Sequence, residues 1–358
     1  MVALSPRPPW RLAAVAALSL TLPVVLAAVC VPGLRQGLGG LAHLSWNGLL
    51  LVPAAQAVSL VEAAQCRRAL LEVGGAPVRL RTALGVAYVG TAVAGSVPVV
   101  GAGVGAACCY RRLTRRGLDA AVAGWALTMY AVLSSLAFAL VMTVGAALSR
   151  RTDAILAGLT GAAVNALPML ALLGAVRRPG VRRLLDRALA AVRVPRRSAP
   201  ASDSPGPARG CAATLARLAA LRATPARQLR AFTHAVCACA ADCLCLALAL
   251  VVAGGSASWQ TLPLAYCLAR TAGSLGLTPG GVGIVETTLA ATLVVGGTPL
   301  DAVLPGVLLW RVVSFWQVVV VGYALLGLDA RAGRAARAAP APTAAPEGPA
   351  APALDQAG

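Results

Sequence analysis

Long uncharged runs decide what this chain can fold into. They cover residues 12–34, 36–61, 82–110, 120–149 and 154–176, and residues 243–328 are nearly continuous apolar sequence with single charges. A membrane-spanning helix needs about 20 apolar residues, and hydrophobic residues make up 58% of the chain against 12% charged residues. The sequence therefore predicts an all-α integral membrane protein, a polytopic helical bundle, rather than a soluble domain.

The net charge of +19 lies between the apolar runs. Arginines gather at 67–81, at 111–116 and throughout 177–230. The positive-inside rule places such clusters on the cytoplasmic face, where they meet anionic headgroups. We therefore expect membrane lipids as partners and no nucleic acid, although a homo-oligomer or an association with other membrane proteins stays possible. The expected location is the cytoplasmic membrane, with several passes.

These basic segments divide the chain into parts. We expect a cytoplasmic N-terminus (1–11), a first membrane half (12–176), an arginine-rich cytoplasmic linker (177–230), a second membrane half (231–328) and a disordered cytoplasmic tail (329–358). There is room for about six full spans of ordinary length. They are expected at about 12–34, 41–64, 120–147, 154–176, 231–253 and 299–328.

The segment at about 82–109 does not fit as a full span, because basic residues flank it on both sides. It contains Pro98, which breaks a helical hydrogen-bond ladder, followed by Gly101 and Gly103, which let a chain turn or pack closely. We predict a re-entrant hairpin that enters and leaves on the cytoplasmic face. A kinked full span with an exposed basic loop outside is the alternative.

A second hairpin is expected at about 260–297, entering from the outside. Its break is the stretch TPGGVGIVE, in which Pro279, Gly280, Gly281 and Gly283 precede Glu286. The two segments also share sequence, since Gly-Ser at 95–96 recurs at 273–274 and Gly-Val-Gly at 103–105 recurs at 281–283. Because three expected spans separate them, the copies would be inverted repeats, an architecture of transporters.

Arg270, Glu286 and Arg311 fall inside membrane segments of the second half. Each costs about 2.5–3.5 kcal/mol in a membrane if unpaired, so we expect them to face the protein interior or a wet cavity. One interpretation is structural, with Glu286 at a helix N-terminus and Arg311 as a buried counter-ion. The other is substrate binding, because arginine can donate two hydrogen bonds to a phosphate and free N–H groups after Gly283 add to an anion site.

Cysteines at 237, 239, 243 and 245 surround Asp242. A metal cluster is one interpretation, but Cys-x-Cys on one helix points its thiols apart, since only residues three or four apart share a face. We therefore expect small packing residues, with no metal and no cofactor. Neither His43 nor His234 has a catalytic partner in the sequence, so we do not expect an enzyme.

The motifs resemble a known family. TPGGVGIVETTLAATLVVGGTPLDAVLPGVLLWRVVSFW (278–316) looks like the signature of the lysylphosphatidylglycerol synthase transmembrane, or flippase-like, family, and AYVGTAVAGSVPVVGAGVGAACCYRRLTRRGLDAAVAGWAL (87–127) extends the likeness to about 12–328. The resemblance implies a polytopic bacterial membrane protein, and some members move modified lipids between leaflets. The first copy lacks the glycine-glutamate and the downstream arginine of many members, and we expect no soluble aminoacyl-transfer domain after the membrane region.

The expected function is transport of a lipid or lipid-linked headgroup that bears a phosphate. The candidate substrate and translocation residues are Arg270, Pro279, Gly280, Gly281, Gly283, Glu286, Arg311, Pro98, Gly101 and Gly103. A non-transporting membrane scaffold or partner subunit is the alternative. A lipid-modifying enzyme is disfavoured because the sequence shows no pairing of a nucleophile with a base.

Overall fold

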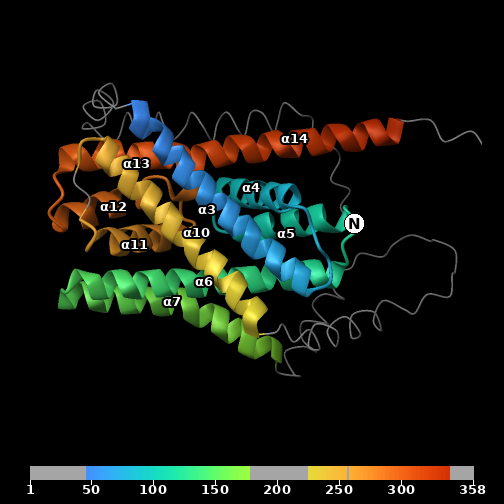
Figure 1. Cartoon of the computed structure of the whole chain (residues 1–358), viewed down its shortest axis with the longest axis horizontal. Coiled ribbons are helices and arrows are strands. Elements are labelled where there is room, and N and C mark those ends of the chain that lie inside the picture. Colours follow the sequence, from blue (N-terminus) through green and yellow to red (C-terminus); the bar gives the residue numbers. More distant parts are fainter. Residues whose placement is uncertain (1–45, 178–224, 256–257, 339–358) are drawn as a thin grey trace, which may run out of the picture.

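A computed structural model of the chain describes residues 46–177, 225–255 and 258–338 (Figure 1). Regular structure within these ranges is helical throughout. The expected N-terminal segment 1–11, the span 12–34, most of the linker 177–230 and the end of the tail lie outside the described residues.

The first half contains five helices in its described part. They are α3 (Trp46–Val73), α4 (Leu80–Ser96), α5 (Gly101–Thr114), α6 (Ala120–Ser149) and α7 (Thr152–Arg177). The second half contains α10 (Pro225–Val252), α11 (Leu262–Ser274), the 3₁₀ turn η2 (Pro279–Gly281), α12 (Ile284–Val295), α13 (Leu300–Arg311), the π-helix η3 (Val312–Trp316) and α14 (Gln317–Ala338).

Helices of the two halves interleave. The α3 helix packs along α10, and α14 packs along α4, so each half contributes one member of both pairs (Figure 1). The α6 and α7 helices form a long pair at one edge of the molecule, opposite α14 (Figure 1). The short helices α4, α5, α11 and α12 lie between these edges.

Four helices of the described chain are long and apolar enough to cross a membrane. Their apolar stretches are Val122–Ser149, Thr152–Ala171, Pro225–Val252 and Val303–Arg331. They correspond to the last four of the six expected spans. The expected span 41–64 coincides with α3, which does not meet the same criteria and carries Glu62, Arg67, Arg68 and Glu72 within its helix. Arg67 and Arg68, expected in a loop, therefore lie on a helix instead.

The four helices of the expected hairpins are too short for a full crossing. The α4 helix has 17 residues, α5 has 14, α11 has 13 and α12 has 12. At about 1.5 Å per residue each is shorter than the roughly 30 Å hydrocarbon core. Helix α4 packs against α5, and α11 packs against α12. The two pairs occupy the expected segments 82–109 and 260–297. The membrane face that each pair enters stays a prediction.

Two buried clusters hold the bundle together. The larger cluster joins α10, α11, α12 and α13 around Trp310, Tyr266, Leu246 and Leu289. The smaller cluster joins α3, α5 and α6 around Leu70, Leu113 and nearby alanines. In contrast, α6 and α7 leave large apolar side chains exposed, which suits helices that face lipid.

Two expected boundaries differ from the structure. The linker prediction extends to residue 230, but α10 already begins at Pro225. The tail predicted to be disordered from residue 329 instead begins as helix, because α14 continues to Ala338. Arginine and alanine are good helix formers, so the basic sequence after residue 328 extends the preceding helix.

Candidate functional site

A cavity of about 410 Å³ lies between the two pairs of short helices. Its size is within the range of about 300–1,000 Å³ that small-molecule sites occupy. The first pair contributes Thr91, Ala94, Gly95, Val97, Val99, Gly101 and Ala102, and the second contributes Arg270, Gly273, Ser274, Gly276, Thr278, Gly280, Gly281 and Val285. Helices α6 and α7 and the α13–η3 junction complete the wall with Ser134, Ser135, Phe138, Asn165, Arg311 and Phe315. The broken helices therefore enclose a shared space.

Five of the ten predicted site residues line this cavity. They are Arg270, Gly280, Gly281, Arg311 and Gly101. The other five do not line it and belong to the loops and helix ends that support it: Pro98, Gly103, Pro279, Gly283 and Glu286. Gly103 in particular is exposed, and a Cβ there would meet no atom within 4 Å.

Arg270 on α11 is a cation of the cavity wall without a hydrogen-bonded or ion-paired partner among the described residues. Its side chain is exposed to the cavity. The carboxylate of Asp242 is close enough to attract it, which offsets part of the cost of keeping a cation inside the protein. The donor groups of Arg270 thus remain available to a ligand.

Asp242 is itself buried and hydrogen-bonded. Its Oδ2 accepts from the hydroxyl of Tyr266 at 2.7 Å, and its Oδ1 accepts from Nε1 of Trp310 at 3.2 Å. The side chain is 6% exposed and does not line the cavity. Asp242 therefore links α10 to α11 and α13 through these hydrogen bonds. It attracts Arg270 electrostatically without itself lining the cavity.

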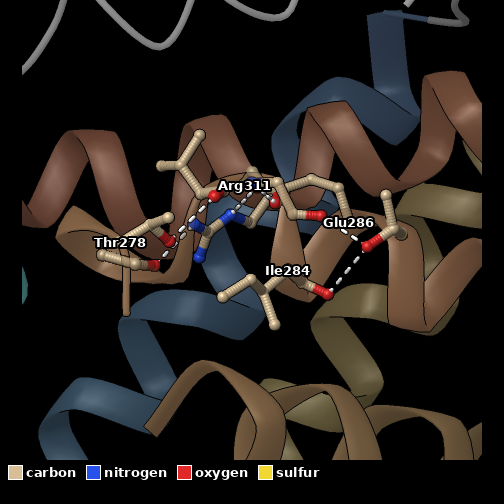
Figure 2. A network of polar contacts seen from close by, with 8 residues as sticks. Thr278, Ile284, Glu286 and Arg311 are labelled. Atoms are coloured by element: carbon tan, nitrogen blue, oxygen red, sulfur yellow. Dashed lines mark hydrogen bonds and ion pairs between the residues drawn. The ribbon is translucent and has the colours of Figure 1, made fainter. Parts of the chain in front are cut away.

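Arg311 and Glu286 form an ion pair at the break before α12 (Figure 2). The Nε of Arg311 donates to Oε1 of Glu286 at 2.5 Å, and its Nη2 donates to the carbonyl of Gly280 at 2.8 Å. The second oxygen of Glu286 accepts the backbone N–H of Gly283 at 2.7 Å. The structural interpretation of these two charges matches this geometry, because together they fix the turn and cap the helix.

Gly280 is required by both its backbone and its surroundings. Its φ of 65° is a left-handed conformation that favours glycine, and a Cβ would lie 2.2 Å from the ring of Phe315. Phe315 sits on the π-helix that follows Arg311, and the guanidinium of Arg311 lies 4.7 Å from the centre of its ring. A π-helix often marks a functional position. Here it places the ring of Phe315 against Gly280, in the break before α12.

The tips of the two helix pairs touch through backbone atoms. The N–H of Val99 donates to the carbonyl of Gly276 at 2.9 Å. Around this contact Val99, Val100, Leu275 and Leu277 are exposed apolar residues, with Leu277 at 70%. The mouth of the cavity thus combines a small backbone contact with an apolar rim.

The neutral polar residues of the wall were not among the residues predicted from the sequence. Ser134 and Ser135 on α6 and Asn165 on α7 all line the cavity. The Nδ2 of Asn165 donates to Oγ1 of Thr271 at 2.9 Å, which links α7 to α11. An asparagine in the middle of an apolar run was the signal that could have identified it, because such a group needs a partner inside the membrane.

The remaining sequence candidates lie away from the cavity. Cys243 and Cys245 are buried in the core, and the thiol of Cys245 donates to the carbonyl of Val52 at 3.3 Å. Within the described ranges, no group of three or more His, Cys, Asp or Glu side chains could hold a metal ion. His234 contacts Glu62 at 2.6 Å and so joins α10 to α3.

Comparison with known proteins identifies the family. No curated protein sequence matches the chain. Residues 7–322 match the sequence profile of the lysylphosphatidylglycerol synthase TM region. Since the match covers nearly the whole chain and the described part is helical with four apolar spans, this multi-pass membrane protein belongs to the lysylphosphatidylglycerol synthase transmembrane family.

Proposed function

We propose that the protein moves a lipid or lipid-linked molecule across the cytoplasmic membrane of a bacterium, with the polar headgroup passing through the cavity between the two hairpins. The observation that supports this most strongly is Arg270, a cation that has no hydrogen-bonded or ion-paired partner among the described residues and lines a cavity built from two broken helices. A purely structural arginine would be expected to donate hydrogen bonds to protein acceptors, as Arg311 does.

The headgroup is the part of a lipid that is costly to move across the membrane. A polar group that crosses hydrocarbon without partners costs several kcal/mol, and a charged one far more. The cavity offers replacement partners for water in Arg270, Ser134, Ser135 and Asn165. The acyl or prenyl chains stay in the bilayer beside the apolar rim, so only the headgroup needs a polar path.

Movement would come from the hairpins. In this proposal they are inverted repeats that open alternately to the two faces. The direct backbone contact between their tips is the hydrogen bond from Val99 to Gly276, and one such bond contributes only about 0.5–1.5 kcal/mol. This hydrogen bond is therefore a small part of the cost of parting the tips, to which the packing of α4 against η2 also contributes.

Reconstituted vesicles test the transport function. The purified protein is placed in vesicles with fluorescent lipids of anionic, zwitterionic and polyprenyl-linked types, and movement between leaflets is followed by dithionite quenching. We expect faster movement than in empty vesicles, and loss of that increase in Arg270→Gln. The matched control is Arg151→Gln, an exposed arginine paired with Asp153 outside the cavity. Movement no faster than in empty vesicles for every lipid would favour the scaffold alternative.

Labelling from outside the cell tests the re-entrant topology. In a cysteine-free background, single cysteines at Gly75 and Thr114 should be protected from an impermeant thiol reagent, because they flank the first hairpin on its cytoplasmic side. A cysteine at Arg150, in the turn between α6 and α7, should react. Labelling at Thr114 from outside would contradict the first hairpin and with it the inverted repeat.

A further inference from the structure

The charge balance of the cavity wall points to a class of headgroup. Resting on the proposed transport function, we propose that the cavity selects headgroups with one negative charge, a phosphodiester that carries neutral hydroxyl groups, and discriminates against cationic headgroups.

Arg270 and Arg311 are the only charged residues among the described residues of the wall. Arg311 is 3% exposed and its charge is balanced by Glu286 at 2.5 Å. Glu286 stands behind Arg311 and does not line the cavity. The wall therefore presents one positive charge that has no ion-pair partner on the wall, with the carboxylate of Asp242 behind it, and within its described part it presents no carboxylate.

Arg270 matches one phosphodiester. Its planar guanidinium can donate two parallel hydrogen bonds to two oxygens of the same phosphate. A phosphodiester carries a single negative charge and two free oxygens, so one arginine satisfies it. A phosphomonoester or a diphosphate would bring a second charge into the cavity without a second free cation to meet it, which costs free energy in a low dielectric.

A cationic headgroup would meet the opposite situation. An ammonium needs acceptors and a negative partner, but the charge that it would meet is Arg270. Asp242, which could attract it, is buried behind the wall with both oxygens already accepting hydrogen bonds. Like charges within a few ångströms repel by several kcal/mol at low effective dielectric. An aminoacylated lipid is therefore disfavoured at this site.

The neutral polar residues match hydroxyl groups. The hydroxyls of Ser134, Ser135 and Thr91 can each donate and accept, and so can the hydroxyls of a glycerol or sugar. Asn165 uses its Nδ2 on protein acceptors, the carbonyl of Gly161 and the hydroxyl of Thr271. Its amide oxygen is thus the part of the side chain that remains to accept from a ligand hydroxyl.

Binding and transport can be measured separately. Binding is followed by thermal unfolding of the full-length protein in neutral detergent with added phosphatidylglycerol, phosphatidylethanolamine, phosphatidic acid or lysyl-phosphatidylglycerol, because a ligand of the folded state raises the unfolding temperature. We expect at least tenfold tighter binding of phosphatidylglycerol than of the lysyl form. Arg270→Gln should abolish this preference, and Arg270→Lys should keep part of it.

A second variant adds a negative charge to the wall. Ser135→Asp places a carboxylate in the same cavity as Arg270 and should weaken phosphatidylglycerol binding at least tenfold while improving binding of the lysyl form. Ser135→Asn is the matched control without charge and should keep the wild-type order.

The outcomes distinguish the two proposals. Transport with a preference for cationic or zwitterionic lipids would overturn the charge inference and leave the transport function intact. Anion-selective binding without any lipid movement would support the charge inference and contradict transport. Equal binding of all four lipids, or the same order in Arg270→Gln as in wild type, would overturn the inference.

Discussion

The ion pair between Glu286 and Arg311 supports a double-mutant cycle whose result the geometry specifies. The perturbations are Glu286→Gln, Arg311→Met and the two together. Glu286→Gln leaves Arg311 as a cation that is 3% exposed with only the carbonyl of Gly280 as acceptor. Removing one partner of a buried pair costs about 3–5 kcal/mol. We expect the lower end, about 3 kcal/mol, because glutamine can still accept from Gly283.

Arg311→Met should cost a similar amount, because it removes two hydrogen bonds but leaves no buried cation unpaired. Glu286 is 22% exposed and keeps its hydrogen bond from the N–H of Gly283 at the start of α12. The loss is then the two charge-assisted hydrogen bonds that Arg311 donates to Glu286 and to the carbonyl of Gly280, about 1.5–3 kcal/mol each. The double variant leaves neither charge unpaired, so its cost should fall below the sum of the single costs by at least about 2 kcal/mol.

Chemical or thermal unfolding of the detergent-purified variants, followed by tryptophan fluorescence, measures these differences. Glu286→Asp, which keeps the charge on a shorter side chain, is the control. Additive costs for the two single substitutions would refute the ion pair as an energetic unit. The exchanged pair Glu286→Arg with Arg311→Glu should recover little, because an arginine at position 286 would face the positive end of α12.

Two further substitutions test the surroundings of the site. Gly280→Ala should cost about 1–2 kcal/mol for the left-handed backbone, with a further cost for the clash with Phe315. Gly297→Ala is the control, because Gly297 has a φ of 91° and a Cβ there would meet no atom within 4 Å. It should show only the backbone cost in the same unfolding assay. Equal costs would contradict the clash. Asp242→Leu should lower the free energy of unfolding by more than about 2 kcal/mol, since it leaves two buried donors unpaired. Tyr266→Phe removes one of those donors and should cost about 1 kcal/mol. A larger cost for Tyr266→Phe than for Asp242→Leu would contradict this assignment.

Much of the fold follows from the sequence because membrane insertion restricts it strongly. Apolar length alone indicates α6, α7, α10 and the α13–α14 segment as spans. The breaks at Pro98 and Pro279 lie between short helices in the structure, where proline is followed closely by glycines that let the chain turn. Proline alone was not a sufficient signal, because Pro53, Pro168 and Pro305 lie inside helices. The start of α10 and the end of α14 were less predictable, since polar sequence beside an apolar run can continue a helix.

The sequence by itself determined the class of protein, the positions of the two breaks and the set of charges that must be accommodated inside the membrane region. It could not distinguish Arg270 from Arg311, because both are single arginines in apolar runs. Only the tertiary structure separated them, by pairing Arg311 with Glu286 while leaving Arg270 on the cavity wall without an ion-pair partner among the described residues. Hydrogen bonds between residues far apart in sequence depend on distances of a few ångströms, and packing alone sets those distances.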